Sequence, residues 1–448
     1  MTQDDLLDPL IGPGFKGFPQ GHPALRRSAL AQAGWNALAG DLPLPIALLK
    51  RGAVEHNVAW MQRQVRHWGI DLAPHGKTTM SPQLFARQLD AGAWGMTFAT
   101  VNQLAIGVAA GVRRALIANQ VLGDADLAAI QYLRRTHAGL RVVFLVDSLA
   151  QLALIEARAQ RQLPSPPFEV MLEVGLPGGR TGCRSHDDAV VLARRLHAST
   201  VVALVGIECY EGLGAQGSTE SDQPYAQALM DRVEAIARLC DCEGLFDGPE
   251  ILLSAGGSAI FDLVATRLKP ELGRPVRGLL RSGCYVTHDH GNYKRYVNAV
   301  EARIGCARGE SLRPALEVWA LVQSCPEPGL AILAVGRRDL SFDIEMPMPI
   351  ARLARAVTHT RAVPDARVAP AAPCAVAPRG VPHSWKISGL NDQHAYLRWE
   401  AADAAEAPAV GDAVGLGISH PCTTFDKWHW MPMVDDHYRV VDAVVMHF

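Results

Sequence analysis

The chain has 448 residues, of which 49% are hydrophobic and 20% charged, and its formal net charge is −2. This length suggests two domains, one of which could be a barrel of about 250 residues. The near-neutral charge leaves no basic surplus for nucleic acid or an anionic membrane. The acidic start "MTQDDLLDPL" lacks the features of a signal peptide, and no apolar run approaches the ~18 residues that span a bilayer. We therefore expect a soluble, cytoplasmic protein.

The first elements in chain order are a strand and a helix in "PIALLKRGAVEHNVAWMQRQV" (45–65). Short β-type runs and longer amphipathic runs then alternate, which is typical of repeated βα units. The helical runs include "SPQLFARQLDAG", "TVNQLAIGVAAG", "DSLAQLALIEARAQ" and "YAQALMDRVEAIARLC". The eight expected strands are Asp71–His75, Gly95–Ala99, Ala115–Asn119, Val142–Asp147, Phe168–Glu173, Val202–Glu208, Glu250–Ser254 and Val276–Arg281. They predict a closed parallel (β/α)8 barrel over residues 51–300. An open doubly wound sheet is the alternative, but the GxGxxG opening that it would usually show is absent.

After about residue 300 the pattern changes to strand-like alternation separated by Pro and Gly, as in "ALEVWALVQSCPEPGLAILAVG" and "HAYLRWEA". This predicts a second, mostly β domain over residues 301–448. The Pro/Ala-rich tract "AVPDARVAPAAPCAVAPRG" (362–380) inside it is most simply an exposed loop or insertion. The nine cysteines, which include no CxxC pair, fit free thiols in a reducing compartment.

One lysine stands at the mouth of the predicted barrel. Lys77, in "LAPHGKTTMSP" (72–82), follows the first barrel strand, on the face where barrel enzymes build their sites. Such a lysine is either ordinary solvated charge or the amine of a Schiff base. After the seventh strand, Gly256 and Gly257 in "SAGGSAIFDL" would let backbone N–H groups approach phosphate oxygens, and Ser258 could add a hydroxyl. An amine and a phosphate cradle on one face describe pyridoxal 5′-phosphate.

Three further side chains fall on the same face. Arg180, in the Gly-rich turn "LEVGLPGGRTGCR", could donate a hydrogen bond to the cofactor ring oxygen or simply lie on the surface. Tyr210 in "IECYEG" could stack on the ring or hydrogen-bond to it, and Tyr285 in "RSGCYVTHDHGNY" could reach the phosphate. A buried tyrosine is more often a packed residue with one satisfied hydroxyl.

Taken together, the motifs resemble a known family. The segments "PHGKT", "GGRTG", "SAGGS", "SGCYV" and "HPCTTFDKW" are similar, in this order, to those of the D-threonine aldolase and D-serine dehydratase family. Its members are fold-type III pyridoxal phosphate enzymes, related in architecture to alanine racemase, and the resemblance covers residues 44–448. It implies that Lys77 holds the cofactor as an internal aldimine, with His75 beside it.

The resemblance also implies a homodimer with a composite active site. In that arrangement the strand around Pro45–Leu49, within the N-terminal segment 1–50, joins the β domain. Two positions depart from the family pattern. Gly76 stands where many members have a larger apolar residue, and Thr79 stands where many have histidine.

The last motif, "GISHPCTTFDKWHW" (417–430), places His420 and Cys422 two residues apart. In an extended segment both side chains would point to one side and could bind one metal ion. An isolated pair lacks the four ligands of a structural zinc site, but it suffices if water and substrate supply the others. The D-serine dehydratase branch resembles this arrangement and binds zinc with it, whereas aldolase members commonly have a carboxylate at the second position and use a harder ion. A soft thiolate favours zinc.

These residues predict a dehydratase that also acts as a deaminase. Lys77 would remove the Cα proton of a D-3-hydroxy amino acid such as D-serine or D-threonine, and zinc would polarise the 3-hydroxyl, giving a 2-oxo acid and ammonia. The D configuration is implied by the resemblance alone.

Four alternatives stay open. One is a metal-dependent D-threonine aldolase, which would give glycine and an aldehyde. An amino acid racemase would need a second acid/base on the opposite face of the cofactor. A single-domain cofactor carrier would lack the β domain, and a structural zinc module would need more clustered ligands. His288, His290 and Asp343 have no assigned role at this stage.

Overall fold

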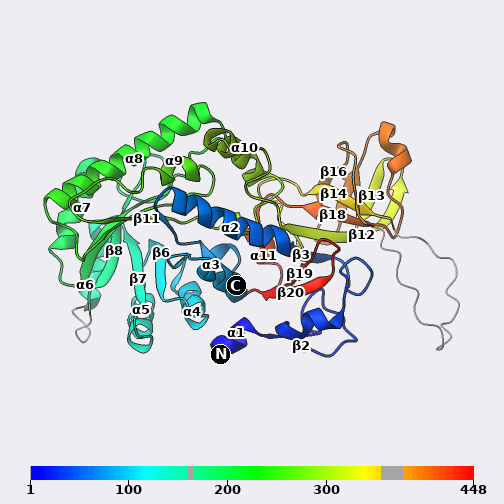
Figure 1. The fold of residues 1–448 in the computed structure, drawn as a ribbon, viewed down its shortest axis with the longest axis horizontal. Coiled ribbons are helices and arrows are strands. Elements are labelled where there is room, and N and C mark those ends of the chain that lie inside the picture. Colours follow the sequence, from blue (N-terminus) through cyan, green and yellow to red (C-terminus); the bar gives the residue numbers. More distant parts are fainter. Residues whose placement is uncertain (1, 160–165, 355–376) are drawn as a thin grey trace.

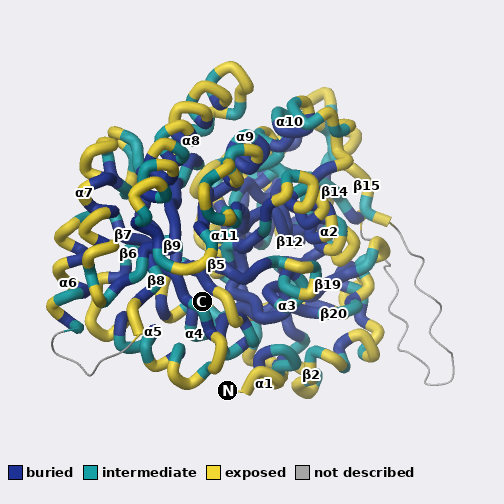
Figure 2. The backbone as a smooth tube through the Cα atoms, turned by 60° about the vertical axis from the view of Figure 1, so that its left-hand side comes forward, coloured by how far each residue is buried: buried dark blue, intermediate teal, exposed yellow. Residues whose placement is uncertain are grey.

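The computed structural model describes residues 2–159, 166–354 and 377–448. Two bodies lie side by side in Figure 1, a barrel wrapped by helices and a body of antiparallel strands. Each has its own large cluster of buried apolar side chains. Figure 2 shows the barrel strands buried inside a ring of helices whose outer faces are exposed. In the described part of the chain, no helix is long and apolar enough to cross a membrane.

The barrel contains eight parallel strands, in the spatial order β4-β11-β10-β9-β8-β7-β6-β5. They are β4 (Asp71–Leu72), β5 (Met96–Phe98), β6 (Arg114–Gln120), β7 (Arg141–Val146), β8 (Phe168–Val174), β9 (Val202–Cys209), β10 (Ile251–Ala255) and β11 (Val276–Leu280). The sheet closes because His75 forms a parallel bridge with Thr97. All eight predicted strands are present, so the predicted barrel is confirmed and the open-sheet alternative is wrong.

Helices follow the strands and cover the outside of the barrel (Figure 1). They are α2 (Arg51–His67), α3 (Pro82–Asp90), α4 (Val101–Ala109), α5 (Asp124–Thr136), α6 (Leu149–Ala159), α7 (His186–His197), α8 (Thr219–Cys242), α9 (Phe261–Ala265) and α10 (Asn292–Ile304). Local signals begin several of them, since Thr100, Ser185 and Ser218 each accept a backbone N–H at a helix N-terminus. Two short 3-10 turns matter for the site, η2 (Gly76–Thr78) after β4 and η3 (Cys284–Val286) after β11.

The second body is built on the long strand β12 (Leu316–Glu327), which pairs antiparallel with β3, β13 and β18. Strand β3 (Ile46–Lys50) is the strand expected around Pro45–Leu49, and it also runs parallel to β19. The other strands here are β13 (Leu330–Leu333), β14 (Met348–Leu353), β15 (Arg379–Gly380), β16 (Lys386–Leu390), β17 (Ala395–Arg398), β18 (Ala413–Gly417), β19 (Trp430–Val434) and β20 (Val440–Val445). The boundaries at 50/51 and 300/301 stay predictions.

The N-terminal segment adds α1 (Gln3–Leu7), the short pair β1 (Leu10–Ile11) and β2 (Leu25–Arg26), and the 3-10 helix η1 (Arg27–Ala33). A further 3-10 helix, η4 (Ala401–Glu406), and the one-turn helix α11 (Cys422–Phe425) complete the second body. Residues 362–376 of the loop or insertion expected over 362–380 lie outside the described part of the chain.

Candidate active site

Lys77 lies in the turn η2, just past the carboxyl end of β4, at the mouth of the barrel. The backbone around it is tied down, since His75 N donates to the Ser282 carbonyl at 3.2 Å and Thr97 N donates to the Pro74 carbonyl at 2.8 Å. The Lys77 side chain itself is exposed. The barrel therefore presents this amine to solvent on a rigid turn, as the sequence predicts.

His75 stands beside Lys77 and is partly buried. Its Nδ1 atom is buried without a well-formed hydrogen bond, although the Thr97 backbone lies close enough to act on the ring. Burial lowers the pKa of His75 well below its usual range, and the positive charges of Lys77 and Arg281 add to this. The imidazole is therefore neutral and has a nitrogen available for a hydrogen bond.

Of the two departures from the family pattern, the structure explains Gly76. A Cβ atom on Gly76 would lie 2.8 Å from Phe98 Cε1 and 3.0 Å from Phe85 Cε1. These two rings pack edge to face, with centroids 5.7 Å apart. The aromatic pair fills the space that a larger residue would need, so glycine is the residue that fits. Thr79 is buried beside this turn, and nothing in the structure explains its presence in place of histidine.

The glycine pair after β10 has a partner that the sequence reasoning missed. Gly256 N donates to Glu211 Oε2 at 3.0 Å, and Gly257 N donates to Glu211 Oε1. Glu211 is fully buried, and burial raises the pKa of its carboxyl against the opposing effect of these amides. The two N–H groups expected to bind phosphate are thus already engaged. The sequence offered one signal for Glu211, an acidic residue just after the apolar barrel strand β9.

The Tyr285 side chain points into the barrel. Its hydroxyl accepts a 2.9 Å hydrogen bond from Gln88 Nε2, and its side chain is 4% exposed within the barrel's apolar core. The chain turns into η3 directly after β11, and this turn directs the ring inward. The hydroxyl is therefore already engaged by Gln88, and the expectation that Tyr285 reaches the phosphate stays a prediction.

The same turn offers different donors. Among the described residues, the backbone N–H groups of Gly283 and Cys284 donate no hydrogen bond. Gly283 packs directly on the lysine turn, since a Cβ there would lie 2.5 Å from Thr78 Oγ1 and 2.9 Å from the His75 carbonyl oxygen. These two amides, together with the partly exposed Ser258, are the better candidates to bind an anion near Lys77.

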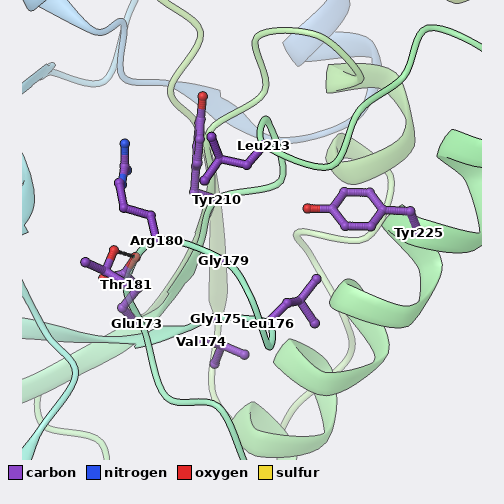
Figure 3. A pocket seen from close by; sticks show the side chains of 10 residues that line it. All are labelled: Glu173, Val174, Gly175, Leu176, Gly179, Arg180, Thr181, Tyr210, Leu213 and Tyr225. Atoms are coloured by element: carbon purple, nitrogen blue, oxygen red, sulfur yellow. Dashed lines mark hydrogen bonds between the residues drawn. The ribbon is translucent and has the colours of Figure 1, made fainter.

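Arg180 and Tyr210 line one hollow at the barrel mouth, drawn in Figure 3. The Arg180 guanidinium carbon lies 4.9 Å from the centre of the Tyr210 ring, a cation–π contact. Burial raises the pKa of Tyr210 to about 12, so the hydroxyl stays protonated. The Tyr210 ring also reaches the glycine pair, because a Cβ on Gly256 would lie 2.4 Å from Tyr210 Cδ2. The structure therefore brings these two predicted residues together.

A buried ion pair lies under this surface. Arg281, at the end of β11, bonds to Glu208, to the Cys209 carbonyl at 3.2 Å and to Ser254 Oγ at 2.5 Å. Both charged side chains are at most 3% exposed. Burial raises the pKa of Glu208 to about 8, even with Arg281 opposing it. Arg281 follows β11, and its bonds reach Glu208 in β9 and Ser254 in β10, so the pair holds the spacing of these three strands. Removing either charged partner would leave the other charge buried and unpaired.

The His420–Cys422 motif differs from the extended segment expected from sequence. Pro421 adopts a helical conformation (φ −58°, ψ −43°), and Cys422 is the first residue of α11. Proline favours this φ at the start of a helix, and the bend replaces strand-like alternation. The expectation of an extended segment was wrong. The two side chains still lie close enough to interact, since Cys422 raises the pKa of His420.

Asp343, left unassigned by the sequence, holds the histidine of this motif. Its Oδ2 atom lies 2.5 Å from His420 Nδ1, and its Oδ1 accepts a 2.8 Å hydrogen bond from Thr423 Oγ1. Burial alone would lower the pKa of His420, but the bonds to Cys422 and Asp343 outweigh it and raise the value to about 9. With Nδ1 held by Asp343, the other ring nitrogen is the one left for a metal.

Cys422 connects the two bodies of the molecule. Its Sγ lies 3.6 Å from Thr78 Oγ1, the residue after Lys77, and 3.6 Å from Cys284 Sγ. Hydrogen bonds with Cys284 and His420 hold the pKa of Cys422 well below its usual range. The lysine motif and the His–Cys motif, 344 positions apart in sequence, thus meet at one point.

Of the other two unassigned histidines, His288 is buried and His290 is partly buried. His288 Nε2 and His290 Nδ1 have no hydrogen-bond partner among the described residues. Burial lowers the pKa of His288 to about 3 and that of His290 to about 4, with Lys294 adding to both effects. Both rings are neutral. The His290 ring packs under β18, where a Cβ on Gly417 would lie 2.5 Å from its Cγ.

These observations test whether the implied groups fit. An exposed lysine amine, a buried histidine nitrogen without a proper bond and the two backbone amides without a hydrogen bond among the described residues suit a phosphorylated aldehyde cofactor. A thiol and an imidazole in contact suit a soft divalent metal. In the described parts of the chain, no group of three or more His, Cys, Asp or Glu side chains is placed so that it could hold a metal ion.

The barrel with its antiparallel neighbour is the alanine racemase-like fold, and comparisons with known proteins agree. The sequence matches the family "Alanine racemase, N-terminal domain" over residues 49–274 and the family "Putative serine dehydratase domain" over residues 315–434. It is 30% identical over 314 residues to D-threo-3-hydroxyaspartate dehydratase of Delftia sp. (strain HT23), covering 67% of this chain and 73% of that protein. It is 27% identical over 398 residues to D-threonine aldolase of Arthrobacter sp, covering 88% and 89%.

A solved structure gives the same fold. It is D-threo-3-hydroxyaspartate dehydratase with a cysteine-to-alanine mutation, described as metal-free, and it aligns with a TM-score of 0.66 at 23% identity over 91% of this chain and 98% of that one. The chain belongs to the D-threonine aldolase and D-serine dehydratase family of fold-type III pyridoxal phosphate enzymes. It is accordingly a pyridoxal phosphate-dependent lyase.

Proposed function

We propose that this lyase is a zinc-dependent dehydratase that converts a D-3-hydroxy amino acid to a 2-oxo acid and ammonia. The observation that carries the proposal is the 3.6 Å contact between Cys422 Sγ and Thr78 Oγ1. It brings a soft metal-binding pair within one residue of the lysine. Dehydration of a 3-hydroxy amino acid needs both the lysine and the metal, since the Cα proton and the 3-hydroxyl that are removed lie on neighbouring carbon atoms.

Several residues would hold pyridoxal phosphate. Lys77 would bind the aldehyde carbon, the N–H groups of Gly283 and Cys284 would donate to the phosphate, and Arg180 with Tyr210 would cover the ring. When bound, the cofactor acts as an electron sink for the bond broken at Cα. The rigid strand ends around Lys77 fix the amine in place, which a proton transfer at a defined carbon atom requires.

Lys77 would take the proton from Cα once the substrate has replaced it on the cofactor. His75 supports this step without competing for the proton, because its imidazole is neutral and buried. Its free Nδ1 atom can accept a hydrogen bond from a group bound beside Lys77. Arg281, buried in its pair with Glu208, helps to keep the His75 imidazole neutral through its positive charge.

His420 and Cys422 would hold zinc, which as a Lewis acid would favour departure of the 3-hydroxyl. Asp343 fixes the imidazole in the orientation that leaves its other nitrogen for the metal. A solved D-threo-3-hydroxyaspartate dehydratase with a cysteine-to-alanine mutation is described as being in the metal-free form. The thiolate in this chain favours zinc over magnesium or manganese.

A D-threonine aldolase is the second candidate, because the Arthrobacter aldolase aligns over most of this chain. Both reactions need the lysine, the cofactor and a metal at the 3-hydroxyl. They differ in the bond that breaks, which is C–O for the dehydratase and Cα–Cβ for the aldolase. We favour dehydration because a thiolate-bound zinc suits loss of the hydroxyl as a leaving group.

One substrate separates the two candidates. With D-threonine, a dehydratase releases 2-oxobutanoate and ammonia, whereas an aldolase releases glycine and acetaldehyde. We expect 2-oxobutanoate and ammonia, lost on chelation, restored by zinc and reduced at least about 100-fold in Cys422→Ala. The exposed thiol Cys242 provides a control, because Cys242→Ala leaves the site untouched. Glycine and acetaldehyde as main products would mean that the aldolase assignment is correct.

A homodimer is part of the same proposal. The loop that carries Asp343 exposes three apolar side chains, Phe342 (37%), Ile344 (44%) and Met346 (42%), beside the His–Cys motif. Exposed apolar residues gathered in one loop favour contact with another protein surface. We infer that the loop packs against a second copy, and light scattering of the holoenzyme should give two chains per particle. A mass of one chain would contradict this.

A further inference from the structure

A second thiol lies against the predicted metal pair. Cys284 begins η3, directly after the last barrel strand, and its side chain is 7% exposed. Its Sγ lies 3.6 Å from Cys422 Sγ, and both sulfur atoms contact Thr78 Oγ1, at 3.9 Å and 3.6 Å. The barrel and the β domain therefore each place one sulfur atom at the same point. The proposed reaction uses only Cys422.

The His420–Cys422 pair supplies two protein ligands and leaves the other positions of a metal ion to water, substrate or a further side chain. Catalytic zinc usually has three protein ligands and keeps the fourth position for water or substrate, and a Cys2His set is one established form. Of the side chains that contact Cys422, Cys284 is the one that brings a further zinc-binding atom. Asp343 holds the far nitrogen of His420, so it orients the imidazole rather than completing the ligand set.

The sulfur separation suits a shared metal. Two sulfur atoms bound ~2.3 Å from one zinc at a tetrahedral angle lie about 3.8 Å apart. The observed 3.6 Å differs from this by a small side-chain rotation. The three side chains do not form a finished cage in the part of the chain described, so the metal must draw them together on binding.

We infer that Cys284 is a third protein ligand, which makes a His–Cys–Cys zinc site with one position open for the 3-hydroxyl of the substrate. This inference rests on the proposed function. Two thiolates balance the charge of a divalent zinc ion, so the open position accepts a neutral hydroxyl. The metal would also join the barrel to the β domain, because Cys284 belongs to one and His420 and Cys422 to the other.

The test replaces zinc with Co²⁺ in the holoenzyme and measures sulfur-to-cobalt charge-transfer absorption, whose intensity follows the number of Co–S bonds. At a Co²⁺ concentration high enough to keep cobalt bound to each single variant, we expect about half the wild-type intensity in Cys284→Ala and in Cys422→Ala, and none in the double variant. Cys240→Ala is the matched control, because Cys240 is an equally buried thiol in α8 and should keep full intensity. Zinc affinity, measured by competition with a chromophoric chelator, should fall at least about tenfold in Cys284→Ala. Cofactor absorbance should not change, because the Cys284 backbone N–H remains.

Full charge-transfer intensity in Cys284→Ala would overturn the inference and leave the proposed function intact. Absence of any charge transfer in the wild-type protein would overturn the zinc site itself, and with it both proposals. If Cys284→Ala does not fold, the comparison of wild type with Cys422→Ala still decides. With cobalt bound to Cys422→Ala, half the intensity left supports Cys284 as a ligand, and bound cobalt without charge-transfer absorption contradicts it.

Discussion

The barrel mouth and the β domain build their parts of the site by different means. In the barrel, Lys77, Arg180 and Tyr210 each follow the carboxyl end of a strand, and the parallel ladder fixes where each strand ends. In the β domain, His420 is oriented by Asp343, which lies 77 positions away, and Cys422 is placed by contacts with the barrel residues Thr78 and Cys284. Backbone pairing positions the first set, whereas side-chain contacts position the second.

This difference implies that the two halves can be disturbed separately. A change at Lys77, Arg180 or Tyr210 should affect cofactor binding and therefore every later step. A change in the β domain should affect the metal and leave the cofactor in place. Variants from each half, compared for cofactor absorbance and for metal affinity, would show whether this division holds.

The largest effect should come from Lys77→Ala. Removing the amine takes away both the covalent attachment of the cofactor and the base at Cα, so activity should fall by at least about 1,000-fold. Borohydride reduction followed by peptide mass spectrometry should find pyridoxyl on Lys77 in the wild type and none in the variant. Lys269→Ala is the control, because that amine bonds to the Gly69 carbonyl next to the amino end of β4, on the other side of the barrel. Pyridoxyl on another lysine would refute the assignment.

An intermediate effect should come from Asp343→Asn. The substitution keeps the size of the side chain but removes the charge that holds His420 Nδ1, so zinc affinity should fall about 10–100-fold. Dehydration should fall with it and should recover at high zinc concentration, while cofactor absorbance stays unchanged. Glu345→Gln is the matched control, because Glu345 lies in the same loop and pairs with Arg295 at the surface. Loss of cofactor from Asp343→Asn would show that the two halves are not separable.

Sequence reasoning located the barrel half of the site better than the β half. Lys77 could be placed because strand ends in a barrel share one face, whatever the packing details. The orientation of the Tyr285 ring could not be predicted, because a 3-10 turn after β11 directs it to Gln88 and no periodicity marks that turn. Glu211 and Cys284 were missed because their roles depend on contacts with residues at least 45 positions away.

In the β domain the motif itself was found, but its conformation was not. Alternation along a strand predicts that His420 and Cys422 share a side, and the helical Pro421 invalidates that reasoning. They meet for a different reason, because α11 packs against η2 and buries Cys422 beside Thr78. Long-range packing of this kind cannot be read from local sequence.

The smallest effect should come from Arg180→Ala, and it tests the outer edge of the barrel half. Arg180 is exposed, and its guanidinium lies 4.9 Å from the centre of the Tyr210 ring. A cation–π interaction of this kind is worth about 0.5–2 kcal/mol. If the two side chains cover the cofactor ring together, cofactor affinity should fall by about 2–30-fold, the range that this energy allows. The zinc affinity should stay at the wild-type value, because Arg180 does not touch the His–Cys motif. Arg114→Ala is the control. The Arg114 guanidinium lies 5.9 Å from the centre of the Trp94 ring at the amino end of β6, so this substitution removes a similar contact away from the barrel mouth. Equal cofactor affinity in both variants, measured by absorbance titration of the apoenzyme, would mean that the hollow under Arg180 does not hold the ring.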